Sequence, residues 1–298
     1  MMPVMKAYKV AAFTKADSGG SPTGVVLNTP EFPDEQLQFI ADQIGLSHTA
    51  FVTEPTAESP LLRIRFFCPA GEILNCGHGT IAAHYARIKH FNLQGKQVLC
   101  QQAKNGIQQV EIVDQNNRVA LFLKQDPIQF STVDLATVLR LPEILGINQD
   151  ELDGNLPVVM ASPGSNRFLI GISSLSILNQ MNPDFDQLKI LCQQNHAIGC
   201  FAYYLDPLNP TADMTARMFA PVIGINEDVI NGNSSGCLGA YLLQLSGQHS
   251  LEIRIRQGHL LHQEGMVHVK VKRTDGHFET FIGGEAKIIE EISLAIPF

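Results

Sequence analysis

The 298-residue sequence has no run of about 18–20 apolar residues, the length that a membrane-spanning helix requires. It has no excess of positive charge either, because its formal net charge is −8, which disfavours nucleic acid and anionic membranes as partners. Lys6 and Lys9 interrupt the apolar N-terminal segment, so we do not expect a signal peptide. The six cysteines show no spacing typical of a disulfide framework, which predicts a reduced, cytoplasmic protein.

The composition, with 45% hydrophobic and 17% charged residues, is that of an ordinary soluble globular protein. The chain is long for one hydrophobic core and suits two domains of roughly 150 residues each. Its two halves also match in residue type and order. Residues 34–52 match 184–204, and residues 63–88 match 215–245, with an offset of about 150 positions. A period of that length indicates duplication of a whole domain rather than a solenoid of short repeats.

Each half is predicted to be mostly strand, with one short helix and one longer helix. The longer helices, 78–91 and 234–246, are nearly apolar for two turns, and a helix that is hydrophobic on most faces is typically buried. The sequence therefore predicts a sheet wrapped around a central helix in each domain. We expect the first domain to span 1–125 and its duplicate to span 126–283. The last segment, 284–298, is a candidate to return to the first domain.

Glycines stand at the start of both buried helices, at Gly77, Gly79, Gly232 and Gly236. The first N–H groups of a helix lack partners within the helix, and together with the helix dipole they bind anions. Two such N-termini facing each other across a cleft between the domains would hold one carboxylated substrate. The alternative interpretation is that the glycines only allow tight helix packing.

Four side chains with acid–base chemistry surround these helix starts, namely His48, Cys76, His78 and Asp228. We expect the helix dipole to lower the pKa of His78 and to favour its neutral form. Cys76 is either a thiol of depressed pKa or an inert buried residue. Asp228 is either a functional carboxylate or one that stabilises a turn.

No metal site is predicted. Cys76 and His78 lie two residues apart, which is too close for an ordinary pair of metal ligands. Cys192, His196 and Cys200 have a spacing that could suggest metal binding, but the first is expected in a helix and the last in a strand.

Several motifs occur in the order typical of one known family, and they span nearly the whole chain. They are "LSHTAFV", "RIRFFCPAGEILNCGHGTIAAHYA", "INEDVINGNSSGCLGAYL", "IRQG" and "FIGGEAKI". Together they resemble the phenazine-biosynthesis isomerase (PhzF-like) family, which has the diaminopimelate epimerase and proline racemase fold. The resemblance implies an α+β fold of two pseudo-symmetric domains, each a mostly antiparallel, barrel-like sheet around a central helix. It also implies a cofactor-independent isomerase or epimerase, often a homodimer, that moves a proton on a small carboxylate-bearing metabolite.

Family members that act in phenazine biosynthesis isomerise trans-2,3-dihydro-3-hydroxyanthranilate, using a glutamate of an "LSET" motif. In this sequence His48 stands in the place of that glutamate. The other catalytic positions implied by the resemblance are His78, from the CGH motif, and Asp228. Positions that the resemblance implies for substrate binding are Ser21, Cys76, Gly77, Gly232 and Asn233. Imidazole changes charge from 0 to +1 when it takes up a proton, whereas a carboxylate changes from −1 to 0.

Three functions follow as hypotheses. The first is an isomerase or epimerase in which His48 carries the proton, assisted by His78 and Asp228. The second is a catalytically silent family member that binds a small carboxylate or a protein partner. The third is racemisation with Cys76 as the only base. Related racemases use two cysteines, but Gly232 takes the place of the second one, and Cys237 is expected to pack inside its helix.

Overall fold

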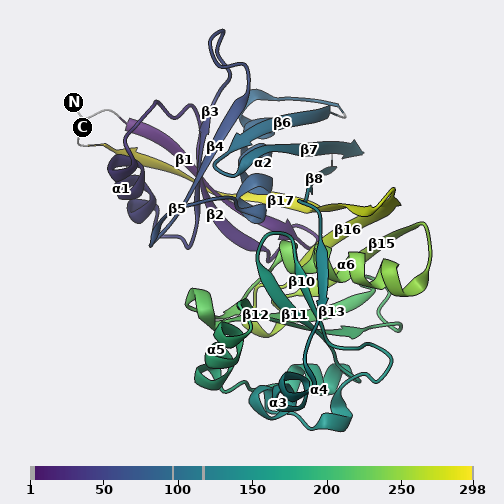
Figure 1. Ribbon diagram of the computed structural model, residues 1–298. Helices are drawn as coiled ribbons and strands as arrows, with labels where there is room; N and C mark the ends of the chain where they lie inside the picture. Colours follow the sequence, from purple (N-terminus) through teal and green to yellow (C-terminus); the bar gives the residue numbers. More distant parts are fainter. Residues whose placement is uncertain (1–3, 96, 116–117, 297–298) are drawn as a thin grey trace. The chain divides into compact units, whose positions relative to one another are not determined.

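The computed structural model describes residues 4–95, 97–115 and 118–296 and divides into two compact units (Figure 1). Unit 1 comprises Met1–Lys124 and Gly283–Phe298, and unit 2 comprises Gln125–Ile282. The structure therefore divides the chain after residues 124 and 282. The sequence predicted divisions after residues 125 and 283, one residue later in each case. Among the described residues, no helix combines the length and the apolar character needed to cross a membrane.

The described residues of unit 1 form two helices and a ring of strands. Its elements are, in chain order, β1 (Val4–Thr14), β2 (Ser21–Val26), α1 (Asp34–Ile44), β3 (Thr49–Thr53), β4 (Leu62–Cys68), β5 (Gly71–Ile73), α2 (Gly77–Phe91), β6 (Gln97–Ala103), β7 (Gly106–Gln115), β8 (Arg118–Lys124) and the part of β17 (His277–Ala295) that begins at Gly283.

The strands of unit 1 close on themselves. β1 pairs antiparallel with β2, β2 runs parallel to β3, and β3 pairs antiparallel with β4. β4 runs parallel to β6, which continues through antiparallel pairs to β7 and β8. Both β8 and β1 pair with β17, and this closes the ring. Parallel neighbours need a long crossover connection, which α1 supplies between β2 and β3, and α2 supplies between β4 and β6.

Helix α2 is buried along most of its length and packs against β1, β2, β3 and β8. Small residues such as Ala82, Ala83 and Ala86 allow strands to approach it closely. The buried imidazole in its middle, His84, forms a hydrogen bond through Nε2 with the side-chain oxygen of Gln101, at 2.7 Å. Burial lowers the pKa of His84 to about 4, so this ring is neutral at pH 7.

Helix α1 covers a second apolar cluster of unit 1. Phe51 from β3 and Phe67 from β4 meet edge to face there, with ring centroids 5.5 Å apart. Such a pair stabilises the fold by about 0.5–1.5 kcal/mol beyond its burial. The N-cap of α1 is Pro33, and no side chain caps the helix. Asp34 lies in the first turn instead, where its charge complements the helix dipole.

Unit 2 holds the remaining helices and strands. Its regular helices and strands are β9 (Gln129–Thr132), α3 (Leu135–Leu145), β10 (Val159–Ser162), β11 (Asn166–Gly171), α4 (Leu175–Gln180), α5 (Phe185–Gln194), β12 (Ala197–Leu205), β13 (Met214–Ala220), β14 (Ile225–Asp228), α6 (Gly232–Ser246), β15 (Ser250–Gln257), β16 (Gly265–Thr274) and the first part of β17.

The strand pairing of unit 2 follows the same order as that of unit 1. β11 runs parallel to β12 across α5, and β12 pairs antiparallel with β13. β13 runs parallel to β15 across α6, and β15 pairs antiparallel with β16. In unit 1 the same alternation runs from β2 to β7. Both units therefore combine mixed sheet with few helices, which is an α+β fold.

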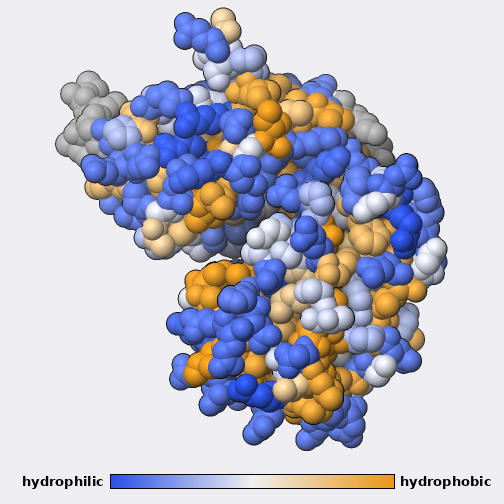
Figure 2. Space-filling view, viewed as in Figure 1, coloured by the Kyte–Doolittle hydropathy of each residue, from blue (hydrophilic) through white to orange (hydrophobic). Residues whose placement is uncertain are grey.

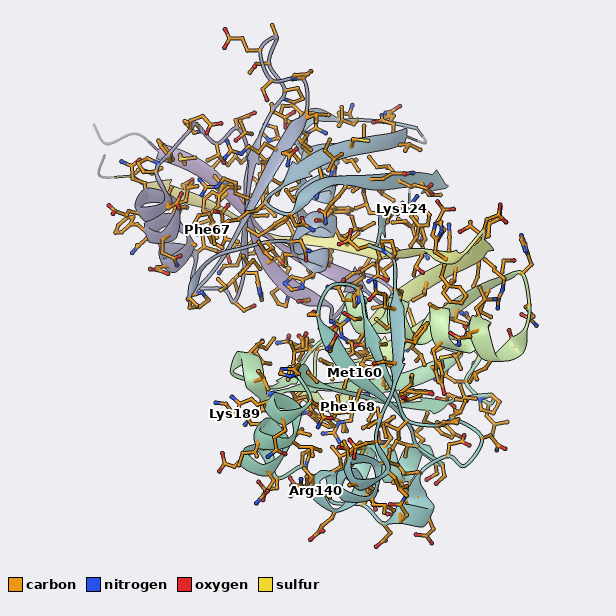
Figure 3. The ribbon with its side chains drawn as sticks, viewed as in Figure 1. Phe67, Lys124, Arg140, Met160, Phe168 and Lys189 are labelled. Atoms are coloured by element: carbon orange, nitrogen blue, oxygen red, sulfur yellow. The ribbon has the colours of Figure 1, made fainter. Side chains whose placement is uncertain are left out.

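The core of unit 2 lies between its strands and the helices α3, α4 and α5. In Figure 3, Met160 and Phe168 lie among the strands, while Arg140 and Lys189 project from helices. Phe168 is fully buried, and Met160 is nearly so. On the face drawn in Figure 2, hydrophobic residues are scattered among hydrophilic ones. Scattered exposed apolar side chains are normal for a folded protein.

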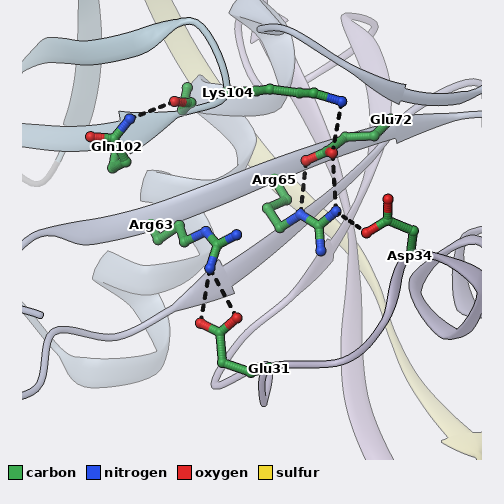
Figure 4. Close-up of polar contacts among 8 residues, drawn as sticks. Glu31, Asp34, Arg63, Arg65, Glu72, Gln102 and Lys104 are labelled. Atoms are coloured by element: carbon green, nitrogen blue, oxygen red, sulfur yellow. Dashed lines mark hydrogen bonds and ion pairs between the residues drawn. The ribbon is translucent and has the colours of Figure 1, made fainter.

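A network of ion pairs joins α1, β4 and β5 of unit 1 (Figure 4). Arg65 donates two hydrogen bonds to Glu72, at 2.8 and 3.0 Å, and a further one to Asp34. Lys104 lies 3.0 Å from the same Glu72 carboxylate. The hydrogen bonds from Arg65 lower the pKa of Glu72, while burial acts in the opposite direction. The Glu72 side chain is only 10% exposed, so this pair is far less screened than a surface pair.

We predict that Glu72→Gln lowers the free energy of unfolding at pH 7 by about 1–3 kcal/mol, because charge-assisted hydrogen bonds are lost. The pKa of Glu72 is lowered by folding, so its contribution is present above the unfolded-state pKa. That contribution is lost as pH falls through the folded-state pKa. The free energies of unfolding of the wild type and of Glu72→Gln should therefore become equal at that pH. Urea denaturation at several pH values measures the difference.

The matched control is Glu31→Gln, which removes the exposed pair with Arg63. Pairs of this kind contribute about 0–1 kcal/mol, so the control should barely change the unfolding midpoint. Equal losses for the two variants would contradict the special role of the Arg65–Glu72 pair.

Candidate active site

His48 lies in unit 1, immediately before strand β3. Its carbonyl oxygen accepts a hydrogen bond from the backbone N–H of Gly24 on β2, at 2.9 Å. Its Nδ1 lies 3.2 Å from the hydroxyl of Ser47. The parallel pairing of β2 and β3 therefore fixes the backbone of His48, and Ser47 orients its ring.

Cys76 is the N-cap of helix α2, and its sulfur accepts a hydrogen bond from the backbone N–H of Gly79 at 3.3 Å. A side chain at position 79 would collide, because a Cβ atom there would stand 2.9 Å from the ring of Phe66 and 3.0 Å from the Cys76 sulfur. Gly79 therefore permits a close, buried start of the helix. Gly77 and His78 occupy the first turn.

The fold brings His48, Cys76 and His78 together. The Cys76 sulfur lies 3.2 Å from Nε2 of His78. The rings of His48 and His78 meet edge to face, with centroids 4.6 Å apart and planes inclined at 77°. One potential ligand atom from each of the three residues lies within 4.8 Å of the other two. Side chains from two separate segments thus form one compact cluster.

Both imidazoles of the cluster are held neutral. Burial lowers the pKa of His48 below its ordinary value of 6.5. Burial, and then the proximity of His48, lowers the pKa of His78 to about 3. The pKa of His78 is lowered, as predicted. The causes are burial and the neighbouring imidazole, whereas the prediction named the helix dipole. A neutral imidazole near another can accept a proton, which is the property required of a base.

In unit 2, Asp228 ends strand β14 and lies close to the start of helix α6. Its carboxylate accepts a hydrogen bond from the side-chain amide of Asn231 at 3.0 Å. Burial raises the pKa of Asp228, and the Asn231 hydrogen bond acts in the opposite direction. The carboxylate is thus desolvated but still has a hydrogen-bond donor.

Asn231 is the N-cap of α6, because its Oδ1 accepts from the backbone N–H of Ser234 at 2.8 Å. Its own backbone N–H donates to Gln257, whose amide donates in turn to Ser235. These contacts fix the loop that carries Gly232. Sequence reasoning missed Asn231, although an asparagine directly before a helical run is a standard cap signal.

Asn233 follows Gly232 in the first turn of α6, and its side chain accepts a hydrogen bond from Gln125 at 3.0 Å. A Cβ atom at position 236 would overlap the side-chain oxygen of Gln125, so a larger residue there would require that side chain to move. The amide of Gln125 therefore packs directly on the start of α6, a contact that the sequence pattern does not reveal.

The remaining predicted residues fall in different places. Ser21 is buried at the start of β2 in unit 1. Asp228, Gly232 and Asn233 belong to unit 2, so the expectation that both groups share one cleft stays a prediction. Cys237 is fully buried in α6, which confirms that it packs. Its sulfur lies 3.4 Å from Nη1 of the equally buried Arg167.

The sequence was compared with known proteins. The model of the family described as phenazine biosynthesis-like protein (PhzC-PhzF) matches residues 10–291. An uncharacterized isomerase of Clostridium acetobutylicum is 33% identical, with 97% of each chain covered. The trans-2,3-dihydro-3-hydroxyanthranilate isomerase of Pseudomonas chlororaphis is 28% identical, with 84% of each chain covered.

Solved structures share the fold. A PhzF-family phenazine biosynthesis protein of Bacillus anthracis superposes with a TM-score of 0.88 at 26% identity, covering 98% of this chain and 99% of the other. A hydroxyproline epimerase of Agrobacterium vitis superposes with a TM-score of 0.63 at 10% identity, covering 98% and 91%. The fold is thus that of the epimerase and racemase class. The chain belongs to the phenazine biosynthesis-like PhzC-PhzF family.

We predict that His78 stays neutral in the folded protein from pH 8 down to about pH 4, because its pKa is lowered to about 3. NMR of the histidine ring signals during a pH titration measures this. The unfolded chain protonates His78 below about pH 6.5, so this residue makes unfolding easier as pH falls. A midpoint for His78 near 6.5 would contradict its desolvation.

Proposed function

We propose that this protein is a cofactor-independent isomerase or epimerase that moves a proton on a small carboxylate-bearing metabolite. The observation that carries the proposal is the pair of neutral imidazoles, His48 and His78, with centroids 4.6 Å apart beside the start of helix α2. Membership of a family with relatives named isomerases supports the same class of reaction. The shared fold of an epimerase is consistent with it.

In the proposed reaction His48 takes a proton from a carbon of the bound acid and becomes an imidazolium. The electron pair left on carbon is delocalised into the substrate, and the proton returns at another carbon or on the other face. His78 supports this transfer, and Asp228 takes part as a carboxylate or carboxylic acid. The positive charge that His48 gains is stabilised by the anionic substrate, an electrostatic arrangement that a glutamate would reverse.

The substrate carboxylate is proposed to bind at the backbone N–H groups where α2 and α6 begin, a common anion site in proteins. Cys76, Gly77 and Ser21 would line it from unit 1, and Gly232 and Asn233 from unit 2. This requires that the two units form one active-site cleft. We also infer that the units arose by duplication and that each sheet encloses one helix, since the pairing order recurs. The family resemblance further suggests a cytoplasmic homodimer.

The Pseudomonas relative is named for its action on trans-2,3-dihydro-3-hydroxyanthranilate. Because His48 replaces the family glutamate, we propose that the present protein acts on another small acid by a related proton transfer. Hydrogen exchange can find such a substrate without knowledge of the product, since proton abstraction in deuterated water labels the reacting carbon.

We predict deuterium incorporation into one or more members of a panel of small amino, hydroxy and unsaturated acids, measured by NMR. His48→Ala should reduce the exchange rate by about 10²–10⁴-fold, the usual contribution of a general acid–base. The matched control is His249→Ala, which removes an exposed histidine and should keep the wild-type rate. Circular dichroism checks that both variants fold.

Equal exchange in His48→Ala and the wild type would overturn the role of His48. Ligand-induced stabilisation without any exchange would support the second candidate, a family member that only binds carboxylates. That candidate draws on the altered motif in which His48 stands in the place of the glutamate that the family resemblance implies.

A further inference from the structure

The His48, Cys76 and His78 cluster is the one group in the described part of the chain that offers three close metal-ligand atoms. These atoms lie within 4.8 Å of one another, and the sulfur of Cys76 is 3.2 Å from Nε2 of His78. A tetrahedral zinc ion, with bonds of about 2.0–2.3 Å, holds sulfur and nitrogen ligands roughly 3.5 Å apart. Small side-chain adjustments therefore suffice to bring three ligands onto one ion.

We propose that His48, Cys76 and His78 form a binding site for one zinc ion. The donor set of one thiolate and two imidazoles suits zinc, and it lacks the carboxylate oxygens that magnesium and calcium prefer. The sequence argument considered Cys76 and His78 alone, whose spacing is unfavourable. The third ligand, His48, comes from a distant segment that only the fold brings to the pair.

The surroundings of the cluster fit a metal site. The backbone N–H of Gly79 already donates to the Cys76 sulfur at 3.3 Å, a contact that also stabilises a metal-bound thiolate. The Ser47 hydroxyl, 3.2 Å from Nδ1 of His48, orients that ring. His48 and His78 are each partly exposed as residues. Three protein ligands leave a fourth position open, as in zinc sites that bind exchangeable molecules.

When zinc binds, one sulfur and two nitrogens form bonds to the ion, and any proton on the Cys76 thiol passes to solvent. The same lone pair of His48 cannot hold zinc and accept a proton at once. Zinc should therefore inhibit any proton transfer by His48. The site itself does not depend on the proposed isomerase activity, because binding is measured with the metal alone.

The test uses the full-length, untagged protein after treatment with a chelator. Calorimetric titration with zinc chloride should give one ion per chain. Cobalt(II) should produce a thiolate-to-metal charge-transfer absorption, which reports the sulfur ligand directly. Cys76→Ser and His48→Ala should each weaken zinc binding by at least about tenfold, a loss that even outer-shell changes cause in zinc sites. Serine keeps an N-cap oxygen at position 76, so this variant preserves the helix start.

The matched controls are Cys100→Ser and His249→Ala, which remove an exposed cysteine and an exposed histidine. Both variants should bind zinc with the affinity of the wild type. With cobalt(II), both should keep the thiolate-to-metal charge-transfer absorption. Absence of zinc binding in the wild type would overturn the site, as would unchanged affinity in Cys76→Ser and His48→Ala. Either result leaves the exchange assay, run with chelator present, as an independent test of the proposed function.

Discussion

The candidate site depends on how the buried start of helix α2 is satisfied. A helix begins with N–H groups that have no partner within it, and burying them without acceptors is costly. Here the Cys76 sulfur accepts the N–H of Gly79, and Gly79 itself fits only because it has no side chain. This arrangement allows His78 to stand in the first turn, 3.2 Å from the same sulfur. The positions of Cys76 and His78 follow from that one cap.

The sequence was informative wherever a local pattern determines the outcome. Gly77, Cys76 and His78 were assigned to the start of a buried helix from the glycines and the apolar run that follows. The two halves match over residues 34–52 with 184–204 and 63–88 with 215–245, and the strand pairing recurs in the same order. Family membership, predicted from ordered motifs, is confirmed by a match over residues 10–291.

Long-range contacts could not be predicted in this way. The contact of His48 with His78 depends on the parallel pairing of β2 and β3, and no local spacing encodes it. Likewise, Gln125 packs on the start of α6 from a position 108 residues away. The causes of the lowered pKa of His78, burial and a neighbouring imidazole, are also tertiary effects. An effect of the helix dipole could be predicted from the sequence, because it depends only on where the helix begins.

The central proposal is that a neutral imidazole, His48, carries the proton in the place of the glutamate that the family resemblance implies. The pH dependence of deuterium exchange tests it most directly, comparing the wild type with His48→Glu. The account predicts a wild-type rate that falls as pH drops through the lowered pKa of His48, below 6.5. In His48→Glu the exchange rate should fall over a different pH range, because a carboxylate replaces the imidazole. An acid limb that stays in place when His48 becomes glutamate would contradict the account.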